Sequence, residues 1–294
     1  MNKNRTTGFT LIELLTALGI VAILIALLLP ALKKVRMLAF DTKQKGQINA
    51  VEIAIETYRT DFAMYPSSGY YPVASNIPRD SDSVPYYGTE KLAEALLGYD
   101  LLGVHQDVRT NFDKLGQDAS GNSLYADAAG KPINLDARKG PYLETDQMNP
   151  VESDSNVDLF DLDAGGHYIG DVYGRDSLKT GMPLLYYKAK PDNRIQNAAV
   201  TTDKVYDYRD SNMSFVTNAS PDADAAYIQG RGTIWNTIDG SKTAEKNFDD
   251  FITNLEISTD TAKIPYRAQS YLLISAGYDG VYGTSDDVCN FERK

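Results

Sequence analysis

A carboxylate lies inside the most apolar stretch of this sequence. Residues 9–29 read FTLIELLTALGIVAILIALLL, and Glu13 is the only ionisable side chain among these 21 residues. Removing a lone charge from water is costly unless a group of opposite charge compensates it. The position of Glu13 therefore predicts a function for its carboxylate, and a backbone amine is the nearest candidate partner.

The other residues that could do chemistry do not form a catalytic pattern. The two histidines, His105 and His167, belong to no Ser/His/Asp or HExxH arrangement that can be read from the sequence. The segment 154–165 begins like an EF-hand calcium loop, but Leu159 stands where that loop needs glycine and Gly165 where it needs glutamate. We therefore predict that the chain is not an enzyme.

Composition and charge exclude further classes. With 43% hydrophobic and 23% charged residues, the composition is that of a folded chain. The 40 acidic side chains outnumber the 29 basic ones, so no positive excess is present to neutralise phosphates, and we predict no nucleic-acid partner. Cys289 is the single cysteine, which excludes a disulfide within the chain.

The apolar run of residues 9–29 predicts a membrane-spanning helix. At about 1.5 Å per residue it is about 30 Å long, which matches the hydrocarbon core of a bilayer. Lys3 and Arg5 precede it, and basic flanks favour a cytoplasmic N-terminus. The run is longer than the core of a cleavable secretory signal, and no A-x-A site follows it. A plain signal anchor is an alternative, but it gives no reason for Glu13.

The sequence GFTLIEL at residues 8–14 has a short basic leader before it and an apolar run after it. It resembles the class III signal of type IV pilins and type II secretion pseudopilins. The resemblance implies cleavage between Gly8 and Phe9 by a prepilin peptidase, which also methylates the new amine of Phe9. It further implies that Glu13 faces the positive N-terminus of a neighbouring subunit in a filament. A buried charge is tolerable chiefly when it is paired in this way.

The helix is expected to continue beyond the apolar run. Proline is common in pilin helices at the place of Pro30, so the resemblance favours a kink over a stop, and Gly46 is a second weak point. Beyond it, five apolar residues step by three and four, which predicts one helix face packed on a globular head. These residues are Ile48, Val51, Ile55, Tyr58 and Phe62.

We predict an α+β, type IV pilin-like fold, in which a long N-terminal membrane-spanning helix packs on a small antiparallel β-sheet head with long inserted loops. In the head, 89–100 predicts a helix with Thr89 as cap and Gly98 at its end, and 241–257 a helix with Phe248, Phe251, Ile252 and Leu255 on one side. Strands are expected at 182–189 and 269–276. The predicted parts are a leader 1–8, a membrane and filament-core helix 9–29, an amphipathic continuation 30–63 and a head 64–294.

The sequence of the head narrows the resemblance. SAGYDGVYGTSDDVCNF at 275–291 resembles the end of the major, G-type pseudopilin of type II secretion. GPYL at 140–143, DVYG at 171–174 and PLLY at 183–186 are similar to that family's GPYL, DPWG and PYxY series, with Val-Tyr where Pro-Trp is usual. The inserted loops 67–139 and 190–265 lie mostly outside the resemblance.

The resemblance also implies calcium in the loop 275–291. Calcium takes about 6–8 oxygen ligands at loose geometry, and carboxylates with main-chain carbonyls can supply them. The first candidate ligands are Asp279 and Asp286, with Asp287 as a third and the carbonyls near Ala276 and Val281 completing the shell. A solvated acidic turn is the alternative.

Two functions follow from these expectations. The first is a structural subunit of a type II secretion pseudopilus or a type IV pilus-like filament. Its partners would be further copies, other pseudopilins, the prepilin peptidase and an inner-membrane assembly platform. It would be held in the bacterial inner membrane by one span, with the head in the periplasm. The second is an adhesive pilin whose tyrosine-rich loops, at 69–71 and 85–87, bind glycans or surfaces.

Overall fold

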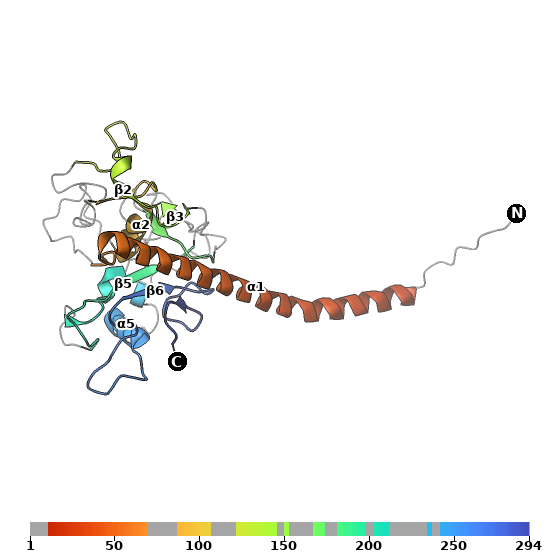
Figure 1. Ribbon diagram of the computed structural model, residues 1–294. Helices are drawn as coiled ribbons and strands as arrows, with labels where there is room; N and C mark the ends of the chain where they lie inside the picture. The colour runs from red at the N-terminus through yellow and green to blue at the C-terminus, as the bar shows by residue number, and fades with distance from the viewer. Residues whose placement is uncertain are drawn as a thin grey trace. The chain divides into compact units, whose positions relative to one another are not determined.

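The computed structural model in Figure 1 describes residues 11–69, 87–106, 122–145, 150–152, 167–173, 181–197, 203–211, 234–236 and 242–293. The chain divides into two compact units, residues 1–42 and 43–294. The fold is α+β, with a long N-terminal apolar helix and small antiparallel sheets, as the sequence predicts.

The long helix α1 comprises Leu11–Phe62, 52 residues in all. It continues through Pro30 and is helical at Gly46, so neither residue ends it. Its N-terminal part is long and apolar enough to cross a membrane, and the side chains of that part are exposed. A soluble core helix would bury such residues, so the exposed apolar surface requires a lipid or protein environment.

The C-terminal part of α1 lies in the core of the second unit. The predicted apolar stripe is confirmed, since Ile48, Val51, Ile55, Tyr58 and Phe62 are all at most 4% exposed. Ile53, on the opposite face, is 69% exposed. The three-four spacing alone therefore identified the face on which this helix packs.

The helix α2, Gly88–Leu97, confirms the first predicted helix of the head but not its cap. The N-cap is Tyr87, whose N–H donates to the Glu90 carboxylate at 2.9 Å. Thr89 lies inside the helix, and its hydroxyl donates to the Leu184 carbonyl instead. Thr89 comes two residues after the N-cap, Tyr87, so its hydroxyl is not placed to cap the helix. Gly98 ends α2 as predicted, with φ of +88°.

The part of the chain that the structure describes contains three small antiparallel sheets. Strand β1 (Val104–His105) pairs with β2 (Arg138–Lys139), and β3 (Pro150–Glu152) pairs with β4 (His167–Ile169). The third sheet has the order β5-β6-β7, formed by Leu185–Lys188, Tyr271–Ser275 and Val288–Cys289. Strands β5 and β6 confirm the two predicted strands at shorter length, with Tyr186 opposite Leu273.

One face of the third sheet packs against α5, Ala244–Ile252, and the short helix η5, Ile234–Asn236. The Thr243 hydroxyl caps α5 by accepting from the Lys246 N–H at 3.3 Å. Phe248, Phe251 and Ile252 are buried as predicted. The prediction for Leu255 was wrong: it lies beyond the end of α5 and is 69% exposed, because the helix stops at Ile252.

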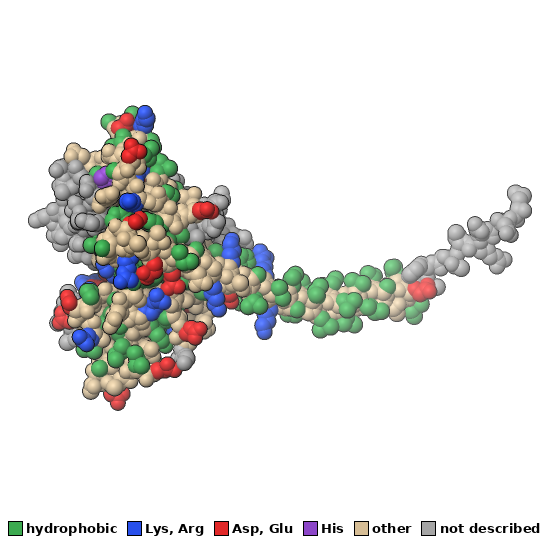
Figure 2. Space-filling model, viewed as in Figure 1, with side chains coloured by type: hydrophobic (Ala, Val, Ile, Leu, Met, Phe, Trp, Pro, Cys, Tyr) green, Lys and Arg blue, Asp and Glu red, His purple; other side chains and the backbone are tan. Residues whose placement is uncertain are grey.

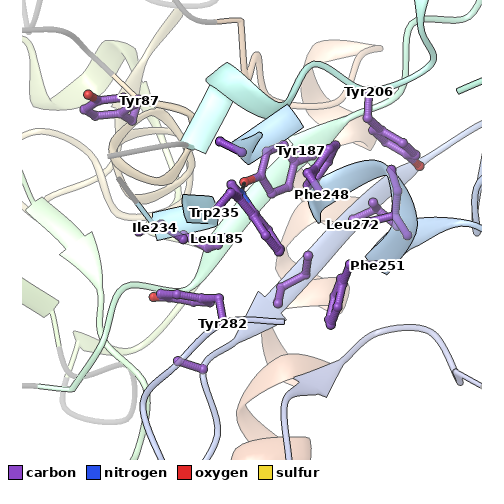
Figure 3. Packing of buried hydrophobic residues seen from close by; sticks show 14 of the residues in the cluster. Tyr87, Leu185, Tyr187, Tyr206, Ile234, Trp235, Phe248, Phe251, Leu272 and Tyr282 are labelled. Atoms are coloured by element: carbon purple, nitrogen blue, oxygen red, sulfur yellow. Dashed lines mark hydrogen bonds between the residues drawn. The ribbon is translucent and has the colours of Figure 1, made fainter. Parts of the chain in front are cut away.

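An aromatic cluster fills this core, as Figure 3 shows. The Trp235 ring lies 5.1 Å from that of Phe248 and 5.5 Å from that of Phe251. Its indole N–H donates to the Tyr187 hydroxyl at 2.6 Å. A buried indole N–H needs such a partner, so Tyr187 contributes both apolar surface and an acceptor. The 3₁₀ helices η2 (Leu135–Ala137) and η4 (Tyr208–Ser211) lie in the connections.

Candidate functional site

Two regions carry the predicted site residues, the start of α1 and the C-terminal loop. At the first, Gly8 and Phe9 lie outside the described residues. Glu13 lies in the first turn of α1 and is exposed. The N-terminal end of a helix carries a partial positive charge, which favours a carboxylate at this place. The Thr16 hydroxyl donates to the carbonyls of Ile12 and Glu13, at 3.0 and 3.1 Å.

The motif that begins at Asp171 contacts the start of the C-terminal loop, at the end of β6. Asp171 is buried, and one of its carboxylate oxygens accepts from the N–H groups of Tyr173 and Met182, both at 3.1 Å. The other oxygen accepts from the Ser275 hydroxyl at 3.3 Å. Gly181 lies so close that a Cβ there would be 2.0 Å from the Asp171 carbonyl oxygen. Asp171 thus joins the segment before β5 to the end of β6.

Two glutamines of α1 hold the same motif, and sequence reasoning missed them. The Gln44 side-chain oxygen accepts from the Val172 N–H at 2.9 Å, and the Gln47 amide donates to the Gly170 carbonyl at 2.9 Å. Both glutamines are buried. They extend the apolar stripe by one turn towards the N-terminus. Their spacing therefore indicated that they are buried, but a stripe defined by apolar residues alone does not include glutamine.

The GPYL motif lies against the end of α1. The Tyr142 hydroxyl donates to the Asp61 carboxylate at 2.8 Å, and the Tyr142 N–H donates to the Leu96 carbonyl at 2.8 Å. The Tyr142 ring meets that of Tyr58 edge-on at 5.9 Å. This motif therefore connects α1 with α2.

The C-terminal loop runs from β6 to β7 and is anchored at its middle by Tyr282. Tyr282 is 1% exposed, and its hydroxyl donates to the Pro183 carbonyl of the PLLY motif. Burial raises the pKa of the Tyr282 hydroxyl well above its ordinary value, so it stays a donor. Three glycines with positive φ, Gly277, Gly280 and Gly283, make the tight bends between these anchors.

The three predicted aspartates all point into this loop. The Asp286 carboxylate accepts from the Asp279 N–H at 2.9 Å and from the Thr284 hydroxyl at 2.6 Å. The Asp279 carboxylate accepts from the Val281 N–H at 2.7 Å, and that of Asp287 from the Gly283 N–H at 2.6 Å. The structure therefore brings Asp279, Asp286 and Asp287 into one hydrogen-bonded turn.

The electrostatics of this turn favour an added cation. Burial, followed by repulsion from Asp286 and Asp279, raises the pKa of Asp287 to about 8. Burial also raises the pKa of Asp279, and the Asp286 charge adds to it. At Asp286 burial again acts to raise the pKa, but the hydrogen bonds from Thr284 and Asp279 outweigh it and the net shift is downward. Carboxylates crowded in this way gain from a positive ion between them.

The oxygen atoms of this loop are the kind of ligand that calcium prefers, but the three carboxylates do not converge on one point. Among the residues that the structure describes, no group of three His, Cys, Asp or Glu side chains is arranged to hold a metal ion. The Asp279 N–H donates to the Asp286 carboxylate, which joins these two residues, while the Asp287 carboxylate accepts from the Gly283 N–H. A calcium ion here would therefore take most of its ligands from carbonyl oxygens and water.

Other predicted features fall outside the structural description. The EF-hand-like segment lies in residues 153–166, and Tyr70, Tyr71 and Tyr86 of the tyrosine-rich loops lie in 70–86, all beyond the described residues. His105 and His167 lie on the separate strands β1 and β4.

Comparisons with known proteins agree with the N-terminal features. The family model described as "Prokaryotic N-terminal methylation motif" matches residues 3–29. The chain is 37% identical over 68 residues to "Type II secretion system core protein G" of Pseudomonas aeruginosa. That match covers 23% of this chain and 48% of the relative, so the chain spans about half the length of the curated relative. No solved structure matches.

The matched residues 3–29 include the predicted processing residues Gly8 and Phe9, the predicted assembly residue Glu13, and most of the exposed apolar part of α1. The small antiparallel sheets follow this helix in the chain. The methylation motif, the long apolar helix and the similarity to core protein G together support a type IV pilin-like pseudopilin.

Proposed function

We propose that this chain is a structural subunit of a type II secretion pseudopilus or a related pilus-like filament. The observation that carries the proposal is the exposed apolar helix of residues 11–32, which has Glu13 in its first turn and overlaps the methylation motif. An exposed apolar helix with one acid near its end is suited first to a bilayer and then to a bundle of identical helices. The role is structural and requires no catalysis by this chain.

The proposed sequence of events follows from the same residues. A prepilin peptidase cleaves between Gly8 and Phe9 and methylates the new amine. Before assembly, the chain spans the inner membrane with its N-terminus in the cytoplasm and its head in the periplasm. On assembly, the Glu13 carboxylate pairs with the N-terminal amine of Phe9 of a neighbouring copy. Pairing two opposite charges removes the cost of burying either one alone, and fixes the register between adjacent helices.

The test compares Glu13→Gln with the wild-type chain in cells that contain the peptidase and the assembly platform. The variant keeps the size and hydrogen-bonding capacity of the side chain but has no charge. We expect normal cleavage, measured by the mass of the mature chain, and loss of filaments in sheared cell-surface fractions. Wild-type filament yield from Glu13→Gln would contradict the charge-pairing argument. Leu15→Gln, two residues further along the helix, controls for polarity without a lost charge.

We also propose that calcium stabilises the C-terminal loop, with Asp279 and Asp286 as the carboxylate ligands and Asp287 beside them. The proposal is supported by the crowded carboxylates and by the tight bends at the three glycines of the loop. Bound calcium would add to the positive charge of Arg293, whose guanidinium donates to the Thr284 carbonyl at 3.0 Å. The residues around it do the rest: Tyr282 and Gly277 fix the course of the loop, and Thr284 orients Asp286.

A further inference from the structure

A basic segment, Lys33, Lys34 and Arg36, follows the apolar part of α1. All three side chains are exposed, and no ion pair joins any of them to a carboxylate of the residues described. Arg36 lies over the ring of Phe40, at 5.8 Å from its centroid. Figure 2 shows Lys and Arg side chains, in blue, on α1 next to its green apolar stretch. The segment therefore presents positive charge that the described part of its own chain does not neutralise.

The position of this segment needs an explanation. In the proposed orientation it lies on the periplasmic side, whereas Lys and Arg next to a membrane span favour the cytoplasmic side. The three cations thus oppose the orientation in which the chain would function. A binding partner of negative charge outside the cytoplasm would account for them.

The remainder of the chain has the opposite charge. After residue 45 lie 38 of the 40 acidic side chains but only 22 of the 29 basic ones. Copies of such a strongly acidic head repel one another when they are packed closely. A basic segment placed between neighbouring heads would reduce that repulsion and fix their register.

The loop 254–264 forms an acidic surface of the head that also exposes large apolar side chains, as the basic segment does. The loop 254–264 after α5 is held by the Asn254 N–H donating to the Ile264 carbonyl at 2.9 Å, and by the Thr259 N–H donating to the Ala262 carbonyl at 2.9 Å. It exposes the acids Glu256 and Asp260, and two large apolar side chains, Leu255 (69%) and Ile257 (54%).

The basic segment shows the same mixture with the sign of charge reversed. Leu32, Val35 and Leu38 lie among its cations and are 60%, 64% and 67% exposed. Interfaces between proteins combine an apolar centre with a polar, charge-matched rim. The two surfaces satisfy this requirement for each other, and a filament brings them together in many copies.

We propose that the basic segment of one copy docks on the loop 254–264 of a second copy of this chain. This inference rests on the proposed filament function, and it names the pair of surfaces that the filament uses. Lys33, Lys34 and Arg36 face Glu256 and Asp260, and the apolar side chains of both surfaces form the centre of the contact.

The test is an exchange of charges in the full chain, expressed with its peptidase and platform. One variant carries Lys33→Glu, Lys34→Glu and Arg36→Glu, a second carries Glu256→Lys and Asp260→Lys, and a third carries all five. We expect each of the first two to lower filament yield about fivefold or more. The third should recover to within about twofold of wild type. Lys131→Glu with Lys139→Glu changes exposed cations elsewhere and should leave the yield unchanged.

Three results would overturn this assignment. The first is equal filament yield from all variants, and the second is loss in both single-surface variants without recovery in the third. The third result combines two observations: the Glu256→Lys, Asp260→Lys variant forms filaments at the wild-type yield, and the Lys33→Glu, Lys34→Glu, Arg36→Glu variant binds phosphatidylglycerol vesicles more weakly than wild type. This result would mean that the three cations bind lipid. A wild-type chain that is cleaved but forms no filaments would instead remove the proposed function, and the docking site with it.

Discussion

Gly277 faces the main-chain carbonyl of Asp286 so closely that a Cβ on Gly277 would lie 2.3 Å from that oxygen. Gly277 also has a φ of +64°, which disfavours any other residue. The C-terminal loop can therefore close only around a glycine at this position. The close approach brings the two ends of the loop, and with them Asp279 and Asp286, to the same place.

Gly277→Ala should lower the free energy of unfolding by about 2–4 kcal/mol, because the added methyl meets a backbone oxygen that cannot move freely. Gly130→Ala is the matched control. Gly130 has a φ of +76° but nothing within 4 Å of an added Cβ, so it should cost only about 1 kcal/mol. Urea unfolding of the detergent-solubilised chain, followed by circular dichroism, measures both. Equal costs would contradict the close contact at Gly277.

Calcium should raise the melting temperature of the chain relative to chelator. At about 100 times the dissociation constant, a ligand that binds only the folded state adds roughly 2.7 kcal/mol to stability. Asp279→Asn with Asp286→Asn should remove this difference, because the amides keep the shape of the side chains but lose their charge.

Two exposed aspartates elsewhere, Asp136 and Asp192, provide the control as Asp136→Asn with Asp192→Asn. These substitutions should leave the calcium effect intact. A wild-type chain with the same melting temperature in calcium and in chelator would rule out the proposed clamp and favour a solvated acidic turn.

Two isoleucines on opposite faces of α1 allow a test of its packing. Ile55 is 0% exposed and Ile53 is 69% exposed. Ile55→Ala should destabilise the head by about 2–5 kcal/mol through the cavity that it leaves. Ile53→Ala should change the stability by no more than about 0.5 kcal/mol. Thermal unfolding of the two variants makes the comparison, and a reversed order would mean that the helix packs on its other face.

Asp207 should make the head sensitive to acid. Burial acts to raise the pKa of its carboxyl, but hydrogen bonds and charge from Arg209, with Lys190 at 3.7 Å, outweigh burial and lower the pKa below its ordinary value. A lowered pKa stabilises the fold above the unfolded pKa of about 3.9, and this contribution is lost as the pH falls through the folded pKa.

Asp207→Asn should therefore cost about 1–3 kcal/mol at pH 7, and the gap to wild type should close below about pH 4. Urea unfolding at a series of pH values measures the gap. The exposed Asp192→Asn should follow the wild-type curve throughout. A gap that stays constant down to about pH 2 would show that the carboxylate charge of Asp207 does not contribute.

The elements that follow from periodicity could be predicted from the sequence, and the contacts of polar side chains could not. The stripe from Ile48 to Phe62 and the strands β5 and β6 follow from which residues must avoid water. Thr89 was expected to cap α2 because threonine often does so, but the helix begins at Gly88 with Tyr87 as its N-cap, and the Thr89 hydroxyl donates to the Leu184 carbonyl. Rules based on the residues next to Thr89 in the sequence cannot include the Leu184 carbonyl, which is 95 residues away in the chain.

The candidate site shows the same division. The acids of the C-terminal loop could be named because the sequence of this loop resembles the end of the G-type pseudopilins, in which calcium is implied. That Asp171 and Tyr282 hold this loop in place could not be predicted, because their partners Ser275 and Pro183 are 104 and 99 residues away in the chain. Gln44 and Gln47 were missed because glutamine is usually exposed. Their burial depends on the Val172 N–H and the Gly170 carbonyl, which the sequence does not show to be close.

Trp235 is the only tryptophan in the sequence, and it lies fully buried against Tyr187, Phe248 and Phe251. The indole emission of the chain therefore comes from a single place, the core beneath β5 and β6. Its wavelength will report whether that core is dry while the chain is in detergent, in a bilayer or in a filament. The protein thus contains its own fluorescent probe, and no label has to be attached to follow the head through assembly.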